Sequence, residues 1–207
     1  MLSGAFVRMT FSGAGCGATW PLCHAQVLPN LKAIQTFIEF HHRASSSFVL
    51  VFALLSLILA RLLKRSLHMY AKRAIFWTVL IVIIEALLGA VLVIFDLVDR
   101  NASWQRALVI TLHLVNTLAL LTTLTISVLW VNAKKNQKWN LNSNKLKQTY
   151  KVIGSFFLVC ILGALTALSD TVVPIDFFGS IFSKDVASQK SFLEMLRPFH
   201  PIAAIIF

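Results

Sequence analysis

The sequence predicts an all-α fold, a polytopic bundle of membrane helices, from its composition and from its apolar runs. Of the 207 residues, 57% are hydrophobic and only 13% are charged, and the mean hydropathy is +0.78. Soluble domains average roughly 45–50% apolar and about 25% charged residues. The long apolar runs match the roughly 20 residues of helix that cross a bilayer. Composition and run length together exclude a soluble globular domain.

The apolar runs define the expected helices in order along the chain. Membrane spans are expected at 44–61, 74–95, 107–131 and 152–169, and a further span begins near residue 198. The opening MLSGAFVRMT is typical of the last turns of a preceding helix, and the final HPIAAIIF stops inside a span. We therefore expect the chain to be truncated at both ends.

The basic residues gather in two connections between the expected spans. Segments 61–73 and 132–151 hold eleven basic residues and no acid, which equals the whole net charge of +11. The alternate segments, 1–43, 96–106 and 170–197, contain seven of the eight acids. By the positive-inside rule the two basic connections face the cytoplasm or its equivalent. The basic residues are accounted for by their role in setting membrane orientation. We therefore expect the lipid bilayer as a partner and expect no binding of nucleic acid.

An internal repeat divides the chain. Gly4-Ala5 precedes a long outer loop and a helix with His42, and Gly163-Ala164 precedes a second outer loop and a helix with His200. The offsets are 163 − 4 = 159 and 200 − 42 = 158 residues. Repeats in membrane proteins often form two similar bundles; the alternative is chance similarity of Gly-Ala pairs in apolar helices. We expect domains at 1–131 and 152–207, joined by a basic linker at 132–151.

Ionisable residues inside apolar spans are costly and are therefore candidates for function. Glu39, His42 and Arg43 are spaced three and four residues apart, so they share one helical face. His113 lies at a depth similar to that of His42, on the outer side of a later span. Two histidines at one depth suit axial ligation of a haem iron. The alternative for each is a hydrogen bond between helices.

Other polar residues leave more than one interpretation open. His200, between two prolines, is either a third ligand near the outer face or part of a helix-start turn. Glu85 is the one acid deep in a span and is either a proton-relay or hydrogen-bonding group, or a buried neutral carboxyl. Cys16 and Cys23 lie in the outer loop, on the oxidising side, where a disulfide can persist. Arg43 either holds the Glu39 carboxylate, clamps a propionate, or is a snorkelling residue at a helix end.

Together these motifs resemble the haem A synthase family of bacterial cytoplasmic and mitochondrial inner membranes. The resemblance rests on GAFVRMTFSGAGCGATWPLCHAQVLP, IEFHHR, EALLGAVLVIFDLV, HLVNTLALL, GALTALSDTVVP and LRPFHP, in this order over nearly the whole chain. It implies an eight-helix architecture of two four-helix halves, of which this chain holds the end of helix 1 to the start of helix 6. It also implies oxidation of a methyl group of haem O to the formyl group of haem A.

The resemblance also implies roles for individual residues. His42 and His113 match the ligand pair of substrate haem O, Glu39 matches an essential catalytic carboxylate, and His200 matches one ligand of a haem B cofactor. Cys16 and Cys23 match the cysteine pair of the first outer loop. The chain departs from the family pattern because the first helix and the second haem B ligand are missing. The second outer loop lacks a cysteine pair, and Glu85 stands where a neutral amide is more usual.

Two other function classes remain alternatives. A di-haem, cytochrome b-like electron carrier would use the same histidines without needing Glu39. A membrane thiol oxidoreductase would depend on Cys16 and Cys23 but not on the histidines. Under the favoured interpretation the expected partners are a haem O synthase, cytochrome oxidase assembly and an unknown electron partner.

Overall fold

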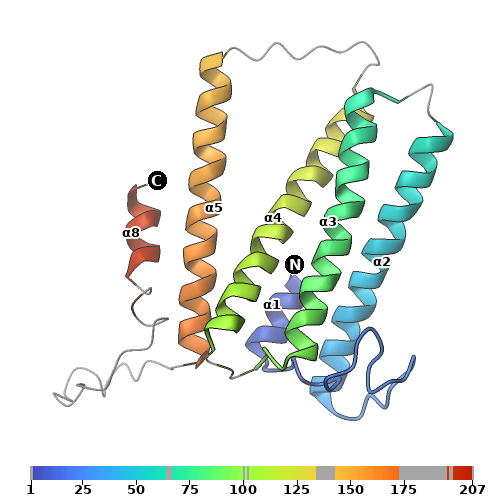
Figure 1. The fold of residues 1–207 in the computed structure, drawn as a ribbon, viewed down its shortest axis with the longest axis vertical. Coiled ribbons are helices and arrows are strands. Elements are labelled where there is room, and N and C mark those ends of the chain that lie inside the picture. Colours follow the sequence, from blue (N-terminus) through green and yellow to red (C-terminus); the bar gives the residue numbers. More distant parts are fainter. Residues whose placement is uncertain are drawn as a thin grey trace. The chain divides into compact units, whose positions relative to one another are not determined.

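The computed structural model describes residues 2–63, 67–99, 101, 103–133, 143–172, 195 and 198–206, and the regular secondary structure over them is helical (Figure 1). The helices are α1 (Leu2–Met9), α2 (Ile34–Leu62), α3 (Met69–Ile94), α4 (Trp104–Val131), α5 (Ser143–Val172) and α8 (Phe199–Ile206). Helices α2, α3 and α4, and Lys147–Thr166 within α5, are long and apolar enough to cross a membrane. The predicted all-α, multi-pass membrane fold is confirmed.

The observed helices extend beyond the apolar runs that predicted them. Helix α2 begins at Ile34 rather than near residue 44, and its first turns carry the polar residues Thr36 and Glu39, which hydrogen-bond to the preceding loop. The amino-terminal segment is helical over α1, as expected. Helix α5 extends into the expected outer segment 170–197 as far as Val172. Residues 173–194 of that segment and the centre of the basic linker, 134–142, lie outside the described residues. The expected domain boundaries stay a prediction.

The chain divides into two compact units, which we describe separately. The first contains Met1–Asp99 and Val115–Asn140, and the second contains Arg100–Leu114 and Leu141–Phe207. Helix α4 therefore contributes its first part to the second unit and the remainder to the first.

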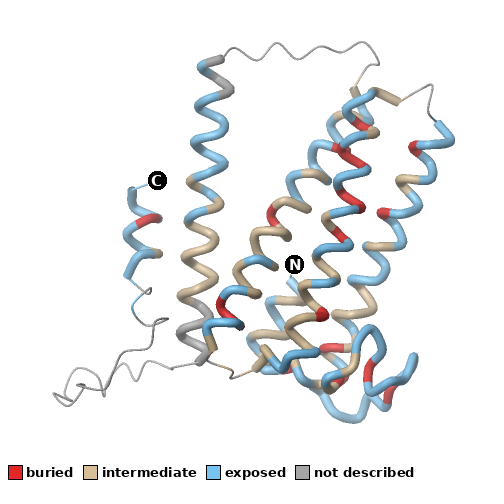
Figure 2. Tube along the Cα trace, in the orientation of Figure 1, coloured by how far each residue is buried: buried red, intermediate tan, exposed pale blue. Residues whose placement is uncertain are grey.

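Helices α2 and α3 pack side by side in the first unit (Figures 1 and 2). Ala53 of α2 is buried against Val79 and Val82 of α3. Small side chains at such a contact let two helix backbones approach closely, which is how helices associate in a membrane. Larger partly buried side chains surround this cluster, namely Leu50, Leu57 and Leu120.

His68 lies at the beginning of α3, in the first unit. Its Nδ1 accepts a hydrogen bond from the backbone N–H of Tyr70 at 3.2 Å, which caps α3. Its ring also stacks on Trp130, with 4.3 Å between the ring centroids. His68 therefore has a structural role in this unit.

In the second unit, helices α5 and α8 pack together. A small apolar cluster there joins the beginning of α4 to α5, with Ala107 buried against Ile110 and Leu165. Helix α8, which has only 8 residues, therefore has α5 as a defined neighbour.

Candidate functional site

The loop between α1 and α2 folds back onto the first turn of α2. Cys16 and Cys23 form a disulfide within it, and both residues are buried. Thr36 donates a hydrogen bond from its hydroxyl to the backbone carbonyl of Gly15 at 2.7 Å. A Cβ at Gly15 would overlap the backbone carbonyl of Gln35, so only glycine allows this approach.

Glu39 and Arg43 fasten this disulfide loop to α2. The Glu39 carboxylate accepts a hydrogen bond from the backbone N–H of Cys16 at 2.6 Å and another from Nε of Arg43 at 3.0 Å. Arg43 also donates to the backbone carbonyls of Thr19 and Leu22, the latter at 2.8 Å. Glu39 is only 2% exposed. All three nitrogens of the Arg43 guanidinium therefore donate hydrogen bonds. Nε and Nη2 bind Glu39, and Nη1 binds the loop carbonyls.

His42 lies one helical turn beyond Glu39 and packs against α1. Its Nδ1 is 3.1 Å from the Ser3 hydroxyl, within hydrogen-bond distance. A Cβ at Gly4 would lie 3.3 Å from Cε1 of the imidazole, so the ring rests almost on the α1 backbone. His41 is exposed and lies 6.4 Å from the ring of Phe37, away from this contact. The two adjacent histidines therefore face different surroundings, as their spacing predicts.

His200 repeats this arrangement in the second unit. Its Nδ1 donates a hydrogen bond to the backbone carbonyl of Val159 at 3.2 Å, and a Cβ at Gly163 would lie 2.8 Å from Cε1 of its ring. In the first unit His42 of α2 packs on a glycine of α1, and in the second unit His200 of α8 packs on a glycine of α5. In both, another residue of the glycine-bearing helix lies within hydrogen-bond distance of Nδ1. The sequence repeat is therefore also a repeat of local structure.

His113 is half-buried on α4, three residues before Asn116. It belongs to the second unit, whereas His42 belongs to the first. Pairing of His42 with His113 therefore stays a prediction.

Glu85 takes part in a hydrogen-bond network between α3 and α4. Asn116 donates from Nδ2 to Glu85 Oε2 at 2.7 Å and to the backbone carbonyl of Ile81 at 3.0 Å. The Thr117 hydroxyl donates to the other oxygen of Glu85. Such bonds between helices stabilise membrane bundles, so Glu85 joins two helices in this structure.

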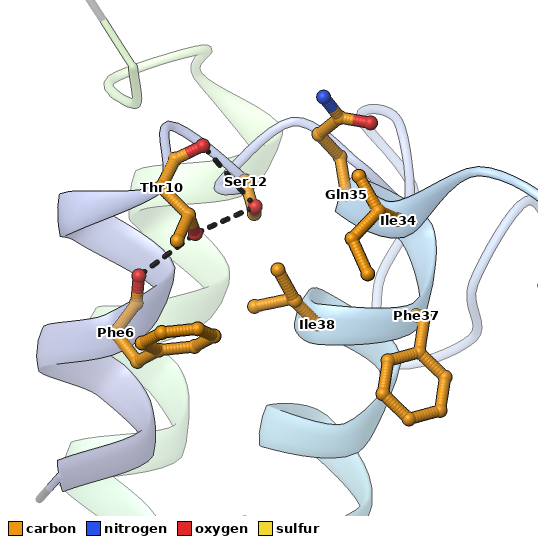
Figure 3. Close-up of a pocket in the computed structure, with 7 residues that line it drawn as sticks. All are labelled: Phe6, Thr10, Ser12, Ile34, Gln35, Phe37 and Ile38. Atoms are coloured by element: carbon orange, nitrogen blue, oxygen red, sulfur yellow. Dashed lines mark hydrogen bonds between the residues drawn. The ribbon is translucent and has the colours of Figure 1, made fainter.

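An apolar groove of about 450 Å³ separates α1 from the start of α2 (Figure 3). Phe6 and Ile38 face each other across it, and Thr10 and Ser12 close one end through a hydrogen bond of 2.8 Å. Phe6 lies two residues beyond Gly4, about 200° around the helix axis. The groove is therefore on a different flank of α1 from the glycine that contacts His42.

Arg8 is a further candidate site residue, which the sequence motifs did not single out. It is half-buried on α1, and its buried Nε has no hydrogen-bond partner among the described residues. The sequence feature that could have identified Arg8 is the presence of a cation in the apolar opening segment, because a charged residue at such a position is costly.

Comparisons with known proteins agree with the motifs. The family model described as cytochrome oxidase assembly protein matches residues 1–207. A Thermus thermophilus protein named protoheme IX farnesyltransferase is 34% identical over 99% of this chain, which covers 33% of that protein. A Bacillus pumilus haem A synthase is 26% identical over the whole chain, which covers 66% of it.

A haem A synthase of Alkalihalophilus pseudofirmus is 44% identical over 46% of this chain, equal to 32% of that protein. This chain thus spans between a third and two thirds of the length of these relatives. No solved structure matches it. Because the family model covers all 207 residues, the chain belongs to the haem A synthase family of cytochrome oxidase assembly proteins.

Proposed function

We propose that this chain binds haem O and takes part in oxidising a methyl group of haem O to the formyl group of haem A. The repeated Gly–His contact, Gly4 with His42 and Gly163 with His200, carries this proposal. A neutral imidazole whose Nδ1 is engaged by a second group is the usual form of a metal-binding histidine. The family membership supplies the reaction class.

The chemistry of these residues fits a haem. Val159 fixes the Nδ1–H tautomer of His200, so Nε2 is the nitrogen that would bind iron. The Ser3 hydroxyl, which can donate or accept, lies within hydrogen-bond distance of Nδ1 of His42. A bound haem supplies the one- and two-electron chemistry that amino-acid side chains lack. In our proposal His42 and His113 hold substrate haem O, and His200 is one ligand of a haem B cofactor.

Glu39 is the proposed catalytic carboxylate, acting as a proton acceptor or charge stabiliser beside the haem held by His42. Its ion pair with Arg43 opposes the cost of burying the ionised carboxylate, which is the form that both roles require. Its hydrogen bond to Cys16 fixes the carboxylate relative to the disulfide loop. The residue therefore positions the loop and holds a negative charge one turn from His42.

The proposed setting is a bacterial cytoplasmic or mitochondrial inner membrane, with the Cys16–Cys23 loop on the outer face. The basic connections support this orientation through the positive-inside rule. A haem O synthase is the proposed supplier of substrate, because farnesyl transfer to protohaem is named in the Thermus relative. Cytochrome oxidase assembly would use the product, and the electron partner is unknown.

The test is mass spectrometry of haems extracted from membranes that contain this chain together with a haem O synthase. We expect haem A or its hydroxylated precursor, lost in His42→Ala and Glu39→Gln chains and retained in the matched His41→Ala control. Bound haem without any oxidised product would favour the di-haem electron carrier. Absence of haem from a stably inserted chain would contradict the assignment of His42 and His113.

A further inference from the structure

Arg8 lies on the same face of α1 as Gly4, four residues further along the helix. Residues at this spacing stack one above the other, about 6 Å apart along the axis. Gly4 is the residue on which the His42 ring rests. Arg8 therefore lies one turn from the His42 contact, at the end of α1 that leads into the disulfide loop.

Unlike Arg43, the Arg8 guanidinium has no hydrogen bond or ion pair with any residue that the structure describes. Its Nε is buried without a hydrogen bond among the described residues, and no ion pair includes it there. Arg43, by contrast, binds Glu39 and two backbone carbonyls. Arg43 is therefore already engaged, and the propionate-clamp role considered for it from the sequence is better suited to Arg8.

We propose that Arg8 binds a propionate carboxylate of the porphyrin whose iron is held by His42. This inference rests on the proposed function. A guanidinium presents parallel N–H donors that match a carboxylate in two-point geometry, and such charge-assisted bonds are strong where water is excluded. A haem carries two propionates on one edge, away from the iron. A ligand carboxylate would satisfy the buried Nε and compensate the cost of holding a cation in an apolar segment.

The experiment is titration of the chain in detergent with ferric haem B and with its dimethyl ester, followed by the haem absorption band. The dimethyl ester keeps the iron and ring but lacks the propionate charges. A His200→Ala background removes the second proposed ligand site. Arg8→Gln and Arg8→Lys are compared with Lys32→Gln, a matched control in which an exposed cation of the neighbouring loop is removed.

We expect Arg8→Gln to weaken binding of the free acid by about 10- to 100-fold, as for loss of a charge-assisted hydrogen bond. Binding of the dimethyl ester should be unchanged, because it offers no anion to Arg8. Arg8→Lys should fall between the parent and Arg8→Gln for the free acid, and Lys32→Gln should match the parent with both compounds.

Equal free-acid affinity in the parent and Arg8→Gln chains would overturn the inference. Equal losses for acid and ester would also overturn it, because they would assign Arg8 a structural role. His42→Ala tests the proposed function separately, through loss of binding of both compounds. If His42→Ala binds haem normally, the ligand assignment fails, and the acid-to-ester comparison still decides whether Arg8 binds a carboxylate.

Discussion

The imidazole of His200 lies so close to Gly163 that a Cβ on that glycine would come within 2.8 Å of Cε1. Gly4 and His42 form the corresponding contact in the first unit, where the distance would be 3.3 Å. Real Cβ atoms essentially never approach a neighbour to 2.8 Å, whereas 3.3 Å requires only a small shift. The two sites therefore share the same glycine–histidine contact, which is tighter between Gly163 and His200 than between Gly4 and His42.

Gly163→Ala should reduce haem retention more than Gly4→Ala, because only the former must displace the imidazole substantially. The measurement is the haem-to-protein ratio after purification, read from the haem absorption band. Gly154→Ala is the matched control on α5, since a Cβ there would meet nothing within 4 Å. A loss of haem in Gly154→Ala equal to that in Gly163→Ala would contradict a specific effect on His200.

Glu39→Gln should loosen the disulfide loop. A glutamine amide offers one acceptor oxygen where the carboxylate serves Cys16 and Arg43 with two, and its NH₂ would face a donor. We expect a loss of about 1–3 kcal/mol in stability and faster cleavage by protease between Cys16 and Cys23. Lys32→Gln is the control, and unchanged proteolysis in Glu39→Gln would argue against the anchoring role.

Gly15→Ala should prevent the loop from docking on α2. The added Cβ would overlap backbone atoms of Gln35, which cannot move as a side-chain tip can. Thiol labelling of purified protein should show more reduced Cys16 and Cys23 than in the parent. Ala14→Ser, at an exposed neighbouring position, should leave labelling at the parental level. Parental labelling in Gly15→Ala would mean that the loop closes without this contact.

Glu85→Leu should destabilise the contact between α3 and α4, because Asn116 and Thr117 would lose the carboxylate that they share. We expect a loss of about 1–2 kcal/mol in detergent unfolding experiments. Glu85→Gln retains an acceptor oxygen and should lose less. Equal stability of the leucine variant and the parent would show that the network contributes little.

The sequence alone determined the membrane fold, because long apolar runs and flanking basic residues reflect the local free energy of placing each segment in a bilayer. It also predicted the repeat of Gly-Ala pairs and histidines, at the nearly equal offsets of 159 and 158 residues. That each glycine contacts its histidine came from the structure. The shared helical face of Glu39, His42 and Arg43 followed from helical spacing. The membrane fold and the shared helical face depend on overall composition or on residues that are near each other along the chain.

Only the tertiary structure decided what the polar groups bind. Spacing placed Arg43 near Glu39, but the distant contacts with Thr19, Leu22 and Cys16 depend on how the loop folds back. Whether Arg8 keeps a buried nitrogen without a protein partner likewise depends on which side chains pack around α1. The period of the α-helix determines the face on which a residue lies. Hydrogen-bond partners from other segments are determined only when those segments pack together.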